Sequence, residues 1–186
     1  SLFISLVLTL GVSTAIAGSH GSTLDLVKER GKVMCGSNTG LTGFGAPNDA
    51  GVWEGIDVDI CRAVAAAVFG DASKVEYVPT TTKVRFTVLQ SGEVDLLARN
   101  TTWTLSRDVD LGLEFVGVNY YDGQGFMVPA ALGVSSATEL DGASVCIQVG
   151  TTTEMNLADY FKANGMSYES VPVAVSYTHL RAHETR

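Results

Sequence analysis

The chain has 186 residues, 46% of them apolar, and a formal net charge of −8. This apolar fraction suffices for a packed core and excludes a disordered chain, while the length allows one domain or two small ones. Acidic and basic residues are interspersed without a basic run, which argues against nucleic acid or an anionic membrane as a partner. We therefore expect a small molecule or a protein as the partner.

The first seventeen residues have the pattern of an export signal. Residues 1–11 form an uncharged apolar run, and residues 15–17 read Ala-Ile-Ala, the small-residue end of a secretory signal. We expect residues 1–17 to be the later part of a signal peptide cleaved after Ala17, with a retained anchoring segment as the alternative. Export would place the remaining chain in an oxidising compartment, where disulfides form.

Helix and strand patterns alternate from residue 23 to residue 98. In chain order, we predict a helix over 23–30 ending at Gly31, a strand over 32–36, a Gly-rich loop over 37–45, a helix to about Phe69, a strand over 75–78, a helix ending at Gly92, and a strand over 94–98. This β-α-β-α-β order implies a parallel sheet with right-handed crossovers.

Two residues in this part carry more specific expectations. Asp57 is a plausible N-cap for the helix in which Ile56, Ile60, Val64 and Ala67 recur at helical spacing. Phe44 is the one large apolar side chain in the Gly-rich loop. It either fills the core or offers a platform for a ligand side chain, and both readings remain open.

Polar residues follow the strand over 94–98 directly. Residues 98–107 read Ala-Arg-Asn-Thr-Thr-Trp-Thr-Leu-Ser-Arg, which places hydroxyls and a guanidinium at the end of an apolar strand, where α/β folds bind ligands. An arginine there can hold a carboxylate through two parallel hydrogen bonds. The alternative is a polar loop whose threonines cap a short helix and whose arginine pairs with a surface acid.

A second unit follows. We predict, in order, a helical turn near 106–109, a β-like stretch with two glycines over 119–128 that crosses or hinges, a helical turn over 136–140, a strand over 143–149, a helix ending at Asn164-Gly165, and a strand over 171–175. Thr151 and Glu154 have capping-box spacing at the start of that helix. A strand, a glycine and a capped helix start suit an anion, although most capped helices bind nothing.

The last eleven residues, 176–186, have no apolar period and resemble translated adapter sequence, so we exclude them from the fold. His179 and His183 have i, i+4 spacing, but no amphipathic pattern supports a helix there, and we expect no metal site.

Two expected anion contacts, at Arg107 and at residues 151–153, lie on either side of the crossing stretch. The simplest interpretation is a cleft between two lobes, in which a carboxylate held from both sides favours the closed form. No Ser, His and Asp assemble at a catalytic spacing, and neither a phosphate loop nor a dinucleotide fingerprint is present, so we expect no cofactor.

Four motifs carry a family resemblance: residues 54–59 (EGIDVD), 89–95 (LQSGEVD), 100–107 (NTTWTLSR) and 149–153 (VGTTT). They resemble the extracellular solute-binding proteins of polar amino-acid ABC transporters, above all the general L-amino-acid-binding branch, and the resemblance covers about residues 23–175. It implies an α/β, two-lobe, type II periplasmic-binding-protein fold with parallel-sheet lobes. The expected division is lobe 1 over 22–120, a hinge over 121–128 and an incomplete lobe 2 over 129–175.

The resemblance also implies roles for single residues. Arg107 would hold the ligand α-carboxylate with backbone N–H groups of Thr102, Thr151 and Thr152, while the Asn100 carbonyl and the Thr102 hydroxyl would accept from the α-ammonium. Phe44 and residues 80–82 would lie near the ligand side chain. Arg85 would reach an acidic side chain or stay on the helix surface. An aspartate that completes the ammonium site in the family has no matching position in this chain.

The cysteines fit the same fold. Cys35 ends the first strand and Cys61 lies in the first turns of the next helix, so the sheet-facing side of that helix brings them within bridging distance, and we predict a disulfide. Cys146 either pairs with a cysteine outside this chain or is a buried apolar residue.

The implied function is capture of free L-amino acids in the periplasm and delivery to an ABC transporter permease, by a monomer that performs no chemistry and binds no metal. An enzyme similar to the periplasmic cyclohexadienyl dehydratases is the first alternative, with Glu54 and Asp57 as the only nearby carboxylates. The sensor lobe of a receptor is the second, which a downstream membrane segment would reveal.

Overall fold

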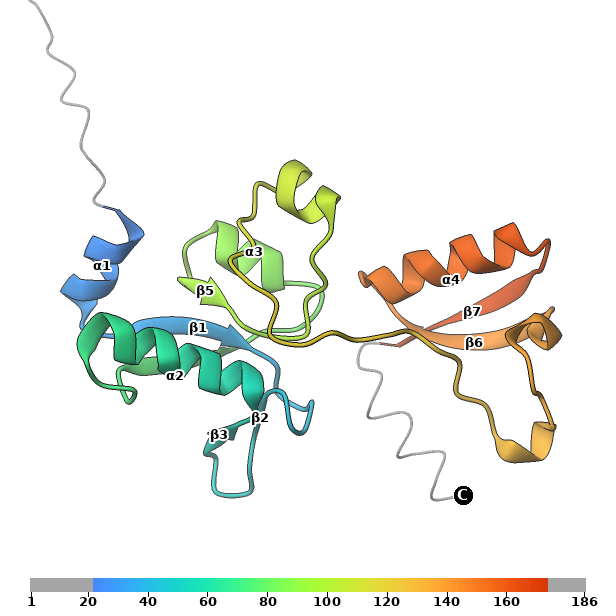
Figure 1. Ribbon diagram of the computed structural model, residues 1–186, viewed down its shortest axis with the longest axis horizontal. Helices are drawn as coiled ribbons and strands as arrows, with labels where there is room; N and C mark the ends of the chain where they lie inside the picture. The colour runs from blue at the N-terminus through green and yellow to red at the C-terminus, as the bar shows by residue number, and fades with distance from the viewer. Residues whose placement is uncertain (1–21, 174–186) are drawn as a thin grey trace, which may run out of the picture.

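The computed structural model describes residues 22–173 (Figure 1). The expected export signal, the end of the last predicted strand and the tail with His179 and His183 lie outside this range. The described elements form two groups, which we call the first lobe (residues 22–111) and the second lobe (residues 130–173). Residues 112–129 run between them and are called the crossing segment.

The first lobe is built on a three-stranded parallel sheet. Strand β1 (Val33–Ser37) lies between β4 (Val75–Pro79) and β5 (Leu96–Leu97), in the order β4-β1-β5. Cys35 is the register partner of Tyr77 on one side and of Leu96 on the other. The predicted parallel β-α-β-α-β arrangement is confirmed. Because all three strands are parallel, the residues that follow them gather at one edge of the sheet.

Three helices accompany these strands: α1 (Thr23–Arg30) precedes β1, while α2 (Ile56–Phe69) and α3 (Arg85–Gln90) form the crossover connections. α1 ends at Gly31, as predicted, and its Val27 packs in a core cluster with Val33 and Ala65 of α2. The apolar period predicted for α2 marks the wrong face, since Ile56 and Ile60 are exposed. The buried face carries Asp57, Val58, Cys61 and Ala65.

Helix α2 begins without a side-chain cap, so the predicted N-cap role of Asp57 is wrong. Gly55 is the N-cap residue, with φ 122°. The N–H groups of Ile56 and Asp57 donate to the carbonyls of Gly43 and Phe44, each at 3.0 Å. The Gly-rich loop therefore satisfies the free N–H groups of the first turn with its own backbone. A short antiparallel pair that the sequence did not indicate, β2 (Ala46–Pro47) with β3 (Trp53–Glu54), returns the chain to this point.

The predicted disulfide between Cys35 and Cys61 is confirmed, with 6.2 Å between the two Cα atoms. It joins the central strand to the buried face of α2 and closes a loop of 26 residues. A loop of this length corresponds to about 3.5 kcal/mol of stabilisation in a chain-entropy model. Cys146 is unpaired within the described chain and exposed, so its interpretation as a buried residue is wrong.

The second lobe has two parallel strands, β6 (Ala143–Gln148) and β7 (Tyr168–Val173), packed against α4 (Thr152–Ala163) (Figure 1). Leu157 and Phe161 of α4 form its core with Ile147 and Leu140. Short 3-10 helices occupy Ala130–Leu132 and Ala137–Leu140. No described helix is both long and apolar enough to span a membrane.

The crossing segment contains neither helix nor strand, so the β-like assignment for residues 119–128 is wrong. It is held to the first lobe at Asn119, whose side chain donates to Asp57, and at Tyr120, whose ring meets Phe44 edge to face. That residues 121–128 act as a hinge remains a prediction.

Candidate functional site

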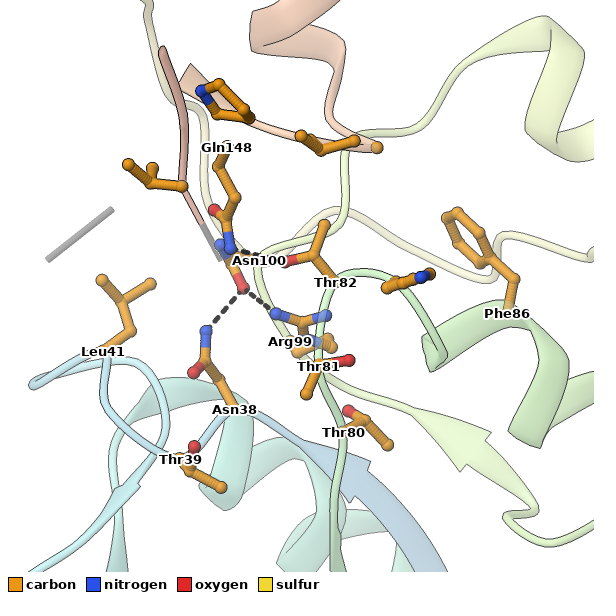
Figure 2. Close-up of a pocket in the computed structure, with 15 residues that line it drawn as sticks. Asn38, Thr39, Leu41, Thr80, Thr81, Thr82, Phe86, Arg99, Asn100 and Gln148 are labelled. Atoms are coloured by element: carbon orange, nitrogen blue, oxygen red, sulfur yellow. Dashed lines mark hydrogen bonds between the residues drawn. The ribbon is translucent and has the colours of Figure 1, made fainter. Parts of the chain in front are cut away.

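A cavity of about 730 Å³ lies where the two lobes meet (Figure 2). Its wall combines amide, hydroxyl and cationic side chains of the first lobe with a smaller set from the ends of β6 and β7. The lining residues are Asn38, Thr39, Leu41, Thr80–Lys83, Phe86, Arg99 and Asn100 from the first lobe, and Gln148–Gly150, Pro172 and Val173 from the second.

Three side chains at the strand ends form a hydrogen-bonded group on this wall. Asn38 follows β1, and Arg99 and Asn100 follow β5 closely. The Oδ1 atom of Asn100 accepts from Nδ2 of Asn38 at 2.9 Å and from Nη2 of Arg99 at 3.0 Å (Figure 2). Asn38 and Arg99 are both buried. These bonds fix the amide and guanidinium planes, so the wall presents an ordered set of polar groups.

Within residues 22–173, two side-chain hydrogen bonds join the lobes. Nε2 of Gln148 donates to Oγ1 of Thr82 at 2.8 Å, and the hydroxyl oxygens of Thr102 and Thr152 lie 3.1 Å apart. Thr102 and Thr152 were predicted from the sequence to hold one ligand, and the structure brings them together. The Gln148 contact was not foreseen.

Arg107 lies beside this junction but not on the cavity wall. It is buried in a π-helical turn over Ser106–Asp110, and its Nη1 donates to the carbonyl of Thr102 at 2.7 Å. Its guanidinium stacks over the ring of Phe86, with Cζ 5.1 Å from the centroid. Burial lowers the pKa of this guanidinium. The site thus holds a buried cation next to the loop predicted to bind a carboxylate.

Arg85 occupies the other predicted cationic position and also lies off the cavity wall. Its Nη1 donates to the carbonyl of Asn100 at 3.0 Å and to Oγ1 of Thr101 at 3.3 Å, and its Cζ is 4.7 Å from the centroid of Phe86. Burial, followed by the positive charges of Arg99 and Arg107, lowers its pKa to about 9. Arg85 is buried rather than on the helix surface, and it supports the loop.

The other residues predicted for the site are Thr80–Thr82, Phe44 and Thr151, and they differ in whether they line the cavity. Thr80–Thr82 line the cavity, whereas Phe44 does not and packs against Tyr120 of the crossing segment. Thr151 is the N-cap of α4, and its hydroxyl accepts from the N–H of Glu154 at 3.0 Å. The Glu154 carboxylate accepts from Gly150 N–H at 2.8 Å, so the reciprocal half of the capping box is displaced by one residue.

Sequence reasoning did not single out Asn38, Arg99 or Gln148. A signal for them exists, because Asn38 and Arg99 follow strands β1 and β5 closely, and Gln148 is the last residue of β6. The rule that ligands bind outside the carboxyl ends of parallel strands applies to each.

Asp57 is a buried carboxylate behind the cavity, 1% exposed. Its Oδ1 accepts from Nδ2 of Asn119 at 2.7 Å, while its Oδ2 has no hydrogen-bond partner among the described residues. Burial raises its pKa, against the opposing effects of the Asn119 bond and of the Arg99 charge. The carboxylate therefore weakens the fold whenever it is ionised.

We expect Asp57→Asn to be at least as stable as the wild type at neutral pH. In the wild type the folded pKa exceeds the unfolded value, so unfolding releases a proton, and stability falls as the pH rises from about 4 through the folded pKa. Asparagine keeps an oxygen for Asn119 and removes the charge, so this fall disappears. Denaturant unfolding at pH 4.5 and 7.5 measures the difference between the two proteins. An equal pH dependence in both would contradict the assignment.

Two lobes with parallel sheets and a cavity lined by residues of both define the architecture of a two-lobe binding-protein fold. Comparison with known proteins agrees. Residues 33–170 match the bacterial extracellular solute-binding proteins, family 3, and the chain belongs to that family.

Among the relatives, the chain is 63% identical over 167 residues to the glutamate/glutamine/aspartate/asparagine-binding protein BztA of Rhodobacter capsulatus, covering 89% of this chain and 49% of the relative. It is 61% identical over 165 residues to the general L-amino acid-binding periplasmic protein AapJ of Rhizobium johnstonii, covering 89% and 47%. The chain thus spans about half the length of these curated relatives.

Solved structures show the same fold. An ABC transporter/periplasmic binding protein from Brucella ovis with glutathione bound superposes with a TM-score of 0.82 at 56% identity, covering 89% of this chain and 52% of the other. A cysteine-binding protein from Campylobacter jejuni gives a TM-score of 0.69 at 23% identity, covering 88% and 64%. The second likeness concerns the fold alone.

Proposed function

We propose that this chain is part of a periplasmic protein that binds free L-amino acids between its lobes and delivers them to an ABC transporter permease, acting as a monomer. The observation that carries the proposal is the polar cavity with wall residues from both lobes, next to the Thr102–Thr152 contact. A ligand at such a junction touches both lobes, so it stabilises their closed arrangement.

In the proposed complex the ligand backbone lies at the junction. Arg107 and the first-turn N–H groups of α4 offer positive charge to the α-carboxylate, and a helix start suits an anion. The Asn100 carbonyl already accepts from Arg85, but its oxygen has a second lone pair for the ammonium, and the Thr102 hydroxyl is the second acceptor. The names of the relatives, as proteins that bind amino acids, support this arrangement.

The proposal favours binding over catalysis. Within residues 22–173, the cavity wall holds no carboxylate that could act as acid or base. Glu54 is exposed and accepts from the Asn48 amide at 2.6 Å, and Asp57 is buried against Asn119. Neither carboxylate considered for the enzyme alternative lines the cavity.

Calorimetric titration of the full-length gene product with a panel of L-amino acids tests the proposal. We expect saturable one-to-one binding of at least one L-amino acid and no heat with its D-enantiomer, because contacts that fix both the carboxylate and the ammonium let only one enantiomer direct its side chain into the cavity. Absence of heat with every amino acid would end the proposal.

A further inference from the structure

The crossing segment is attached to the first lobe at two successive residues. Nδ2 of Asn119 donates at 2.7 Å to Oδ1 of Asp57, a residue that is 1% exposed. The ring of Tyr120 meets that of Phe44 edge to face, with 4.9 Å between the ring centroids. Asp57 and Phe44 are themselves joined, because the N–H of Asp57 donates to the carbonyl of Phe44 at 3.0 Å. The crossing segment therefore moves with the first lobe at this point.

The same segment is attached to the second lobe through Gln124. Both polar atoms of its side chain are used: Nε2 donates to the carbonyl of Thr153, and Oε1 accepts from Nδ2 of Asn156, each at 3.0 Å. Thr153 and Asn156 are neighbours on the surface of α4, because residues three apart lie on the same side of a helix. Phe126 follows and packs beside Phe161 of α4, with 6.0 Å between the ring centroids. From Gln124 onwards the segment therefore moves with α4.

Each attachment holds an element that reaches the junction of the lobes. The loop that carries Phe44 also supplies Asn38 to the cavity wall. Thr153 follows Thr152, whose hydroxyl oxygen lies 3.1 Å from that of Thr102. Within the described chain, the two amide side chains that make the attachments are not among the residues that line the cavity. They can therefore act on a ligand only by placing other groups.

The crossing segment runs from one lobe to the other (Figure 1), and residues 121–123 connect its two attachments. The residues before them are held by the first lobe and Gln124 is held by the second. A change of angle between the lobes therefore bends this segment at residues 121–123. They read Tyr-Asp-Gly, and the glycine has the widest choice of backbone dihedrals. So short a connection restricts the arrangements that the two lobes can adopt.

A ligand that touches both lobes has to fix their relative arrangement. This ordering costs conformational entropy, and the cost is smaller when the connection between the lobes is already restricted. Loss of either attachment lengthens the free part of the crossing segment, so the ligand has more freedom to remove. The affinity then falls for every ligand, whatever its side chain.

We propose that Asn119 and Gln124 are positioning residues for ligand binding. They fix the crossing segment to opposite lobes, confine its bending to residues 121–123 and so raise the affinity for every ligand. This inference rests on the proposed function. It narrows the hinge that the sequence placed over 121–128, because Gln124 and Phe126 are held against α4.

The test begins with calorimetry on the full-length gene product, titrated with each of the twenty common L-amino acids, and on its variants Asn119→Ala and Gln124→Ala. We expect each variant to bind every ligand of the wild type about threefold to tenfold more weakly, the loss that follows from one or two hydrogen bonds. Unchanged affinity in either variant, or a loss confined to one side-chain class, would overturn the inference and leave the proposed function intact. No heat with the wild type would overturn the proposed function itself.

The double variant Asn119→Ala/Gln124→Ala separates action through the crossing segment from local stabilisation of each lobe. Loss of either attachment already frees the segment, so the double variant should bind less than about twofold more weakly than the weaker single variant. Independent local effects would multiply instead, and that result would overturn the inference. Asn164→Ala is the matched control, because it removes an amide that donates to the Tyr160 carbonyl at the far end of α4 and should leave the affinities unchanged.

Circular dichroism checks that the variants are folded. If Gln124→Ala is not, Asn156→Ala takes its place, because it removes one of the two bonds of Gln124 from an exposed position of α4 where alanine favours the helix. We expect Asn156→Ala to weaken binding about twofold to threefold and to add nothing to the loss caused by Asn119→Ala. Unchanged affinity in Asn156→Ala would count against the inference.

Discussion

Arg107→Lys should weaken the binding of every amino-acid ligand by about 1.5 to 3 kcal/mol, or roughly 10- to 150-fold, because a charge-assisted pair is lost. Lysine keeps the charge but lacks the planar pair of donors that can hold a carboxylate while also donating to the Thr102 carbonyl. It also loses the position of the guanidinium over the Phe86 ring. Calorimetry with several L-amino acids measures the effect.

A uniform loss across ligands is the essential part of this result, since every amino acid has the same α-carboxylate. Loss confined to one side-chain class would show instead that Arg107 reads the side chain. Arg62→Lys is the matched control. Arg62 donates to Asp59 and to the Trp53 carbonyl away from the cavity wall, so its replacement should leave affinities unchanged.

Gly55→Ala should destabilise the fold by about 3 kcal/mol or more, the second large effect that the structure predicts. A Cβ atom at this position would lie 2.2 Å from the carbonyl oxygen of Phe44, which is a backbone atom and cannot swing away. The φ of 122° is also strained for any residue with a side chain. Relief would require the loop over 41–45 to leave α2, which breaks the helix cap. Denaturant unfolding measures the loss.

Gly51→Ala provides the comparison. Gly51 has φ 77°, but a methyl group added there would meet no atom within 4 Å beyond its chain neighbours, so only the backbone cost of about 1 to 2 kcal/mol remains. An equal loss in the two variants would mean that the close approach to Phe44 contributes nothing.

Local patterns were sufficient to predict most of the first lobe. Apolar runs between glycines gave β1, β4 and β5, and three parallel strands in that order permit few arrangements. The buried face of α2 was not predictable in this way, because Ile56, Val58, Ile60, Cys61 and several alanines surround the helix with apolar groups. The cap of α2 could not be predicted either. The N–H groups of Ile56 and Asp57 donate to backbone carbonyls, and every residue has a backbone carbonyl, so no residue type marks the cap in the sequence.

In the candidate site, too, some residues could be predicted from local patterns and others only from the fold. Thr102 and Thr152 could be placed together because each follows a strand in a recognisable motif. The strand-end rule points to Arg99, but nothing in the sequence shows that Arg85 is buried beneath the loop and off the cavity wall, because the fold alone decides this. Phe44 likewise depended on Tyr120, a partner 76 positions away in the crossing segment.

The two hydrogen bonds that join the lobes within the described residues are neutral. Hydroxyl and amide hydrogen bonds of this kind contribute about 0.5 to 1.5 kcal/mol each, and nothing in the Thr102–Thr152 or Thr82–Gln148 pair adds charge attraction. Such contacts guide the lobes into register but hold them together weakly. In the proposed transport role, the ligand-free protein would reopen readily, and only the ligand-bound protein would stay closed. A permease that contacts both lobes could then distinguish the two states by shape alone.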